Sequence, residues 1–63
     1  MFKPKEGEMY YSINFVYLDL GESRIDSYTH DGLAHGDIKI GNCFPTKHSA
    51  LLALNKIKKI LKG

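Results

Sequence analysis

The 63-residue sequence contains one cysteine, two prolines, one arginine and no tryptophan. Because Cys43 has no second cysteine to pair with, an internal disulfide is excluded, and a lone thiol is typical of a reducing, intracellular compartment. The chain also lacks a signal-like segment and an apolar run long enough to span a membrane. We therefore expect a cytoplasmic protein that has no membrane role.

The sequence also lacks the usual phosphate-binding and metal-binding motifs. The stretch GLAHGD has no Lys-Ser/Thr ending and is expected to precede a strand, so it is not a nucleotide-binding loop. His30, Asp31, His35 and Asp37 are all potential metal ligands in the segment 30–37. Their spacing matches no standard zinc or calcium pattern, and a solvated loop is the commoner interpretation. We expect neither a metal nor a cofactor.

Nucleophilic catalysis has one weak candidate. Cys43 precedes a predicted helix start and His48 follows it, so the pair could act as thiol and base. A single small thiol between two elements is more often a buried packing residue. A domain of this size also offers little room for a substrate cleft. We expect that the protein is not an enzyme.

What is present indicates one small folded domain spanning residues 1–63. Hydrophobic residues make up 43% of the chain and charged residues 25%, a composition typical of globular domains and unlike that of disordered segments. A chain this short buries only about 60% of its unfolded surface, so its core is thin and self-association as a homodimer would help it. The charges are segregated: residues 1–37 carry −4 and residues 38–63 carry +6.

Residues 9–44 are expected to form an antiparallel sheet after a flexible lead-in at 1–8. The run 9–18, rich in aromatic and β-branched residues, predicts the first strand, and a turn around Gly21 leads to a second strand at 24–29. After the loop 30–37, a third short strand is expected at 38–40. Alternation places one set of first-strand residues on the core face: Met9, Tyr11, Ile13, Phe15 and Tyr17.

Residues 46–61 predict an amphipathic helix. Thr46 is a good N-cap residue, although Ser49 stands where a capping box would have Glu or Gln. A buried stripe follows the helical period and comprises Ala50, Ala53, Leu54, Ile57, Ile60 and Leu61. The fold class is therefore α+β, with a three-stranded antiparallel sheet in β-β-β-α order and the C-terminal helix packed on one of its faces.

Two binding surfaces follow from this architecture. The sheet face that the helix leaves open would expose apolar side chains, and Leu52 would add an apolar point among the helix lysines, which favours contact with a protein partner or with a second copy. The alternative is a nucleic-acid-binding module, in which lysines contact phosphates and tyrosines stack on bases. A single arginine and an acidic first half disfavour it. The candidate residues are Tyr10, Val16, Leu18, Tyr28, Leu52, Lys56, Lys59 and Lys62.

Both ends of the chain resemble a group of small phage and prophage proteins. Members carry KxGExYYxI near the start and GNxFxTxEEAExAxxKIK at the end. The matching residues are Lys5, Gly7, Glu8, Tyr10, Tyr11, Ile13, Gly41, Asn42, Phe44, Thr46, Lys47, Lys56, Ile57 and Lys58. The first helical turn departs from the pattern, since His48-Ser49-Ala50 replaces Glu-Glu-Ala.

The shared residues make physical sense as architecture. Gly41-Asn42 permits an unusual backbone where the chain leaves the last strand, Phe44 fills the core and Thr46 caps the helix. The resemblance implies a mobile-element origin, and small proteins of that kind commonly bind a host protein and alter its activity, for example a defence enzyme or the transcription machinery. It therefore implies an accessory or inhibitor protein that acts by protein–protein interaction.

Overall fold

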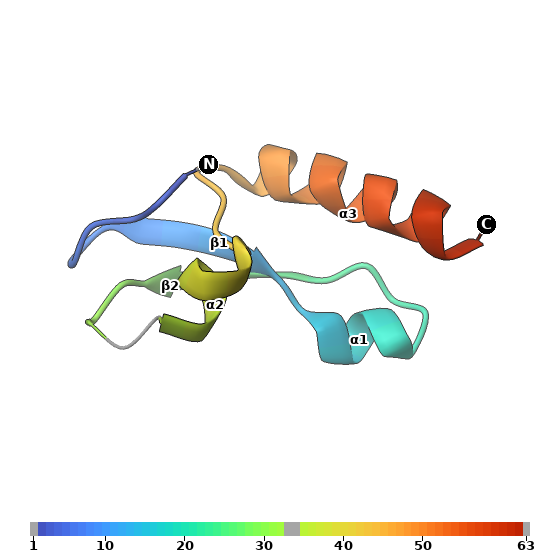
Figure 1. Cartoon of the computed structure of the whole chain (residues 1–63), viewed down its shortest axis with the longest axis horizontal. Helices are drawn as coiled ribbons and strands as arrows, with labels where there is room; N and C mark the ends of the chain where they lie inside the picture. The colour runs from blue at the N-terminus through green and yellow to red at the C-terminus, as the bar shows by residue number, and fades with distance from the viewer. Residues whose placement is uncertain (1, 33–34, 63) are drawn as a thin grey trace.

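A computed structural model describes residues 2–32 and 35–62 of the chain. Its elements, in chain order, are β1 (Met9–Ile13), α1 (Phe15–Asp19), β2 (Ile25–Thr29), α2 (His35–Ile40) and α3 (Lys47–Lys62) (Figure 1). The fold is thus α+β, with a two-stranded antiparallel sheet and a C-terminal helix. None of the described helices is both long and apolar enough to cross a membrane.

The sheet consists of β1 paired antiparallel with β2 in a register that places Tyr10 opposite Tyr28 and Ile13 opposite Ile25. The other edge of β1 is occupied without a third strand. Tyr11 exchanges two backbone hydrogen bonds with Phe44, at 2.9 and 2.8 Å. Two residues along the same edge, Ile13 donates its N–H to Oδ1 of Asn42 at 2.7 Å, and Asn42 Nδ2 donates to the Ile13 carbonyl at 3.0 Å. A side-chain amide therefore completes the ladder.

The third strand expected at 38–40 is wrong, because these residues form the end of α2. An apolar-polar-apolar triplet is too short to distinguish a strand from a helix turn. The helix ends in a Schellman motif: Gly41 donates to the Ile38 carbonyl at 3.2 Å and Asn42 to the Asp37 carbonyl at 2.8 Å. Gly41 has a φ of 75°, which glycine adopts at little cost. This reversal delivers Asn42 to β1.

The first strand ends at Ile13 and does not continue to Leu18. Asn14 caps α1, since its Oδ1 accepts from the backbone N–H groups of Val16 at 3.1 Å and Tyr17 at 3.2 Å. Those bonds satisfy helix-terminal donors that a continuing strand would have used differently. The segment is therefore helical because of its N-cap, despite its strand-like aromatic and β-branched composition. Val16 and Leu18 lie on a helix instead of the sheet.

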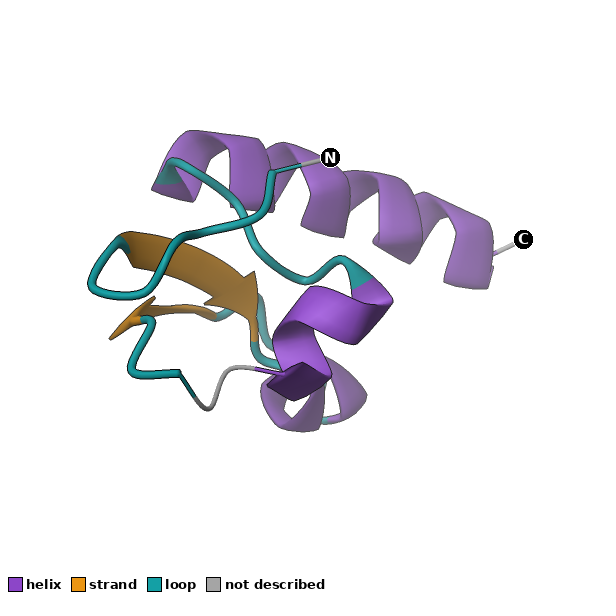
Figure 2. Ribbon diagram, turned by 60° about the vertical axis from the view of Figure 1, so that its left-hand side comes forward, coloured by secondary structure: helices purple, strands orange, loops and turns teal. Residues whose placement is uncertain are grey.

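The core differs from the face that strand alternation predicts. Its buried apolar members are Tyr10, Ile13, Cys43, Ala50 and Leu54. Met9 and Phe15, which were expected inside, are exposed, whereas Tyr10 is only 3% exposed. The buried Tyr10 hydroxyl has a partner, because it donates to Oδ2 of Asp37 in α2 at 3.0 Å. Figures 1 and 2 show α3 running along one side of the two paired strands, with the short helices α1 and α2 away from α3.

The predicted helix is confirmed, with its cap at Thr46. Ser49 donates its backbone N–H to Thr46 Oγ1 at 3.1 Å, and Ser49 Oγ accepts from the Thr46 N–H at 3.4 Å. Ser49 thus replaces the Glu or Gln of a capping box with a shorter reciprocal contact.

The buried stripe of α3, by contrast, is shorter than the sequence predicts. The 16 residues of the helix extend about 24 Å, whereas the five-residue strands extend about 17 Å. Ala50 and Leu54 are buried, but Ile60 is 77% and Leu61 71% exposed. Figure 1 shows that the C-terminal half of α3 passes beyond the strands and lies opposite α1.

Candidate functional site: a groove between α1 and α3

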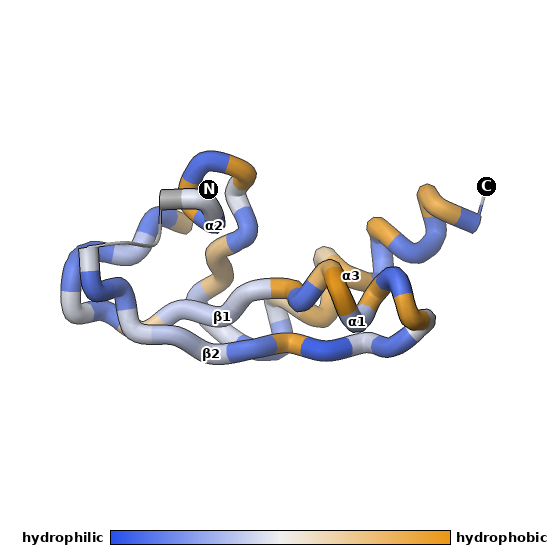
Figure 3. The backbone as a smooth tube through the Cα atoms, turned by 90° about the horizontal axis from the view of Figure 1, so that it is seen from below, coloured by the Kyte–Doolittle hydropathy of each residue, from blue (hydrophilic) through white to orange (hydrophobic). Residues whose placement is uncertain are grey.

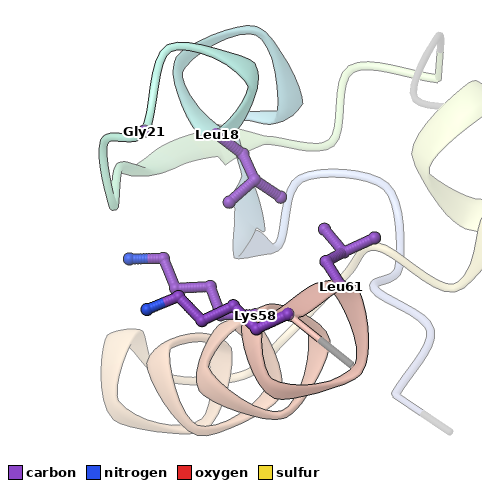
Figure 4. A pocket seen from close by; sticks show the side chains of 5 residues that line it. Leu18, Gly21, Lys58 and Leu61 are labelled. Carbon is purple, nitrogen blue, oxygen red and sulfur yellow. The ribbon is translucent and has the colours of Figure 1, made fainter.

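A groove of about 210 Å³ lies between α1 and the C-terminal turns of α3. Its lining is formed by Leu18 and Gly21 from α1 and the turn that follows, and by Lys58, Leu61 and Lys62 from α3. Figure 4 shows the side chains of Leu18 and Leu61 directed toward one another from the two helices. The groove is apolar in its centre and carries two ammonium groups.

A polar network attaches α1 to β2 and so sets the position of the groove wall. Asn14 caps the helix and donates its Nδ2 to Oδ2 of Asp26 at 2.8 Å. Arg24 forms an ion pair with Asp26, with 3.0 Å between Nε and Oδ1, and its guanidinium lies 4.3 Å from the centroid of the Tyr17 ring. The hydrogen bonds from Asn14 and Arg24 lower the pKa of Asp26. The carboxylate that joins these groups therefore stays charged at neutral pH.

The end of α1 closes in the same manner as the end of α2. Gly21, with a φ of 82°, donates to the Leu18 carbonyl at 3.0 Å, and Glu22 donates to the Tyr17 carbonyl at 2.8 Å. The following residue, Ser23, accepts a hydrogen bond from Nζ of Lys58. One groove lysine thus joins α3 to the loop between α1 and β2.

Apolar side chains continue outside the groove. Val16 is 72% exposed and Leu20 69% exposed on α1, and Ile60 projects from α3. Figure 3 shows hydrophobic positions concentrated in α1, and alternating with hydrophilic ones along the last turns of α3. Clusters of exposed apolar residues bordered by polar groups mark contact sites more often than single exposed hydrophobes do.

The lysines of α3 have no acidic partner within the described residues. The ion pair found there joins Arg24 to Asp26, and none of the α3 lysines approaches a carboxylate within salt-bridge distance. The last two turns hold four of them: Lys56, Lys58, Lys59 and Lys62. The α3 wall of the groove thus carries lysines that form no ion pair with a described residue.

The structure brings two of the predicted site residues together, since Leu18 and Lys62 both line the groove. Val16, Leu52, Lys56 and Lys59 are exposed but do not line it. Tyr10 was predicted on an open sheet face and is buried. Its partner Tyr28 is 48% exposed, with the two ring centroids 5.8 Å apart. The open-face surface, as predicted from strand alternation, therefore does not exist in that form.

Sequence reasoning missed Gly21, Lys58 and Leu61 as groove residues. Leu61 was assigned to the core because it falls on the helical stripe, and only the shortness of the strands removes the surface it would cover. Gly21 was recognised as a turn residue. A signal for α1, one wall of the groove, was nevertheless present, because Asn14 is a favoured N-cap residue.

A cluster of titratable groups is formed by Tyr10, Asp37 and Cys43. Burial, and then the hydrogen bond to Asp37, raise the pKa of Tyr10 to about 12. Burial raises the pKa of the Cys43 thiol, and the Asp37 carboxylate raises it further. A raised pKa keeps the thiol protonated, which is the reverse of nucleophile activation. Cys43 is buried, as the packing interpretation predicts.

The segment 30–37 lies partly outside the described residues, because positions 33–34 are not among them. His30 Nδ1 accepts a hydrogen bond from the Gly32 N–H at 2.9 Å, and Asp37 accepts from Tyr10. Within residues 2–32 and 35–62, no three His, Cys, Asp or Glu side chains come together in a way that could hold a metal ion.

Comparison of this chain with protein-family models, with curated proteins and with solved structures finds no match.

Proposed function

We propose that this protein is a protein-interaction module whose partner binds in the groove between α1 and α3. The observation that carries the proposal is the pair Leu18 and Leu61, which face each other across an open groove. In a chain with a thin core, burying these two leucines would stabilise the fold, yet the groove between them is open. Val16, Leu20 and Ile60 are further exposed apolar residues on or beside the same two helices. Binding energy is concentrated in the large side chains that become buried at the centre of an interface.

The resemblance to small phage and prophage proteins supports one biological setting for this module. There it would be a cytoplasmic accessory protein that binds a host protein, such as a defence enzyme or a component of transcription, and alters or inhibits its activity. Within this proposal Asn42, Phe44 and Thr46 maintain the fold, and the groove binds the partner. Catalysis has no part in it.

The test is affinity capture from host lysate with a matched pair of variants. Leu61→Glu places a charge in the groove at a 71% exposed position, and Ile40→Glu makes the same change at a 67% exposed position on α2, outside the groove lining. We expect the parent and Ile40→Glu to retain the same host protein and Leu61→Glu to lose it, with all three showing the same circular dichroism. Equal retention by both variants would refute the groove as the binding site.

A second candidate, nucleic-acid binding, is favoured by the unpaired lysines Lys56, Lys59 and Lys62. It requires aromatic platforms as well, and Tyr10 is buried while Tyr28 packs against it. Without base stacking, phosphate contacts alone would give weak binding that falls steeply with salt. A gel-shift assay with single- and double-stranded probes at low and moderate salt measures this directly.

A further inference from the structure

We propose that the groove selects an acidic protein segment, anchored by one large apolar side chain between Leu18 and Leu61. The inference rests on the proposed function and specifies the chemistry of its partner. Three properties of the site carry it: the size of the groove, the placement of its lysines and the absence of compensating acids on α3.

The size of the groove fits a side chain and not a drug-sized molecule. Its volume is about 210 Å³, whereas pockets for small-molecule ligands are on the order of 300–1,000 Å³. A cavity of about 150 Å³ is enough for a benzene ring. One leucine, methionine or phenylalanine side chain therefore fills the space between Leu18 and Leu61. An amphipathic helix that places its apolar face into a groove supplies such an anchor.

The charges specify what flanks the anchor. Lys58 and Lys62 line the groove, and Lys59 is exposed beside them on the same helix. Because these ammonium groups have no carboxylate partner among the described residues, carboxylates on the α3 side of the anchor meet positive charge without displacing an existing ion pair. Electrostatic complementarity of this kind mainly accelerates association and excludes wrong partners.

The C-terminal end of α3 from a second copy is a poorer occupant. The exposed apolar residues at the end of α3, Ile60 and Leu61, stand between Lys59 and Lys62. If this end entered the groove of another copy, its lysines would approach Lys58 and Lys62, and like charges brought together oppose binding. An acidic partner avoids that repulsion.

The probe is a short synthetic helical peptide with leucines one turn apart and glutamates at its remaining exposed positions. Two control peptides replace the glutamates by lysines or the leucines by serines. Binding to the isotope-labelled full chain is followed by amide chemical shifts at low salt. We expect shifts centred on Leu18, Gly21 and Leu61 with the acidic leucine peptide, and none with either control.

A matched pair of charge reversals then tests the lysines. Lys62→Glu acts at the groove and Lys47→Glu acts at the other end of the same helix, so the two variants have the same net charge. We expect Lys62→Glu to weaken the acidic peptide at least about threefold and Lys47→Glu to leave it unchanged, because a local ion pair becomes a local repulsion. An equal effect of both would mean that overall charge, and not the groove, attracts the peptide.

Other outcomes would overturn the inference in identifiable ways. Equal binding of the lysine peptide, an oligonucleotide that shifts the same amides more strongly, or a concentration-dependent dimer that Leu61→Glu abolishes would each replace the acidic partner by another. Failure of the acidic peptide alone, with host-protein capture still lost in Leu61→Glu, would refute the acidic chemistry and leave the proposed function intact.

Discussion

Replacing Asn42 by alanine tests how this small sheet is held together. The Asn42 side chain is buried and forms two hydrogen bonds with the backbone of Ile13, at 2.7 Å and 3.0 Å. Asn42→Ala leaves that N–H and that carbonyl without partners. Each unsatisfied buried group costs about 1–3 kcal/mol, so losing two partners should lower the free energy of unfolding by about 2–6 kcal/mol.

This loss is large for such a chain. At about 0.05–0.15 kcal/mol per residue, 63 residues provide roughly 3–9 kcal/mol in total. We expect the midpoint of thermal unfolding to fall by at least about 8 °C, or the fold to be lost. Circular dichroism during heating and urea titration measures the change, and hydrogen exchange at the Ile13 amide locates it.

The chain offers a control at another asparagine. Asn55 is exposed on α3, and Asn55→Ala should change stability by at most about 0.7 kcal/mol, in the stabilising direction, because alanine is the better helix former. A third variant covers the case in which Asn42→Ala does not fold. Asn42→Asp keeps an acceptor for Ile13 but opposes a carboxylate to its carbonyl, so its stability relative to the parent should improve as the pH falls and the carboxyl protonates. An Asn42→Ala protein within about 0.5 kcal/mol of the parent would refute this account.

Three further predictions concern the hydroxyl of Tyr10, the cap of α3 and the end of α3. The pKa of Tyr10 is about 12 in the folded protein and 10.0 for an ordinary tyrosine. The free energy of unfolding should therefore be unaffected below pH 10 and fall between pH 10 and pH 12. Urea unfolding at several pH values measures this fall, which should be smaller for Tyr10→Phe. Thr46→Ala should lower the free energy of unfolding by about 1 kcal/mol, and no change would mean that Thr46 is not the effective cap. Leu54→Ala should cost about 2–5 kcal/mol and Leu61→Ala less than about 0.5 kcal/mol; similar costs in urea titration would show that Leu61 belongs to the core.

Local signals in the sequence predicted the parts of the fold that local interactions determine. Thr46 lies at the start of α3 as expected, because its hydroxyl reaches a backbone N–H within the same turn. The antiparallel pairing of the first two strands was also predicted. Gly41 was recognised as a residue with unusual backbone, and it has a positive φ at the end of α2.

The errors arose where a contact distant in sequence or a single cap outweighs composition. The run after Asn14 has strand-like residues, but the Asn14 side chain fixes the first turn of α1. Tyr10 was assigned to an open face because nothing near it in sequence indicates that Asp37, 27 positions later, accepts its hydroxyl. Asn42 was interpreted as a backbone feature alone, and its bonds to Ile13 span 29 positions.

The groove shows why helical periodicity alone overestimates the core. A stripe of apolar residues indicates which face of α3 can be buried. The length of the surface that packs against this face determines how much of the stripe is buried. Here the C-terminal half of α3 extends beyond the strands, and α1 lies opposite it without closing the space. Ile60 and Leu61 continue the apolar stripe but are exposed, so they add little to the stability of a single molecule. Under the proposed function, a partner that covers those residues is the reason for their presence.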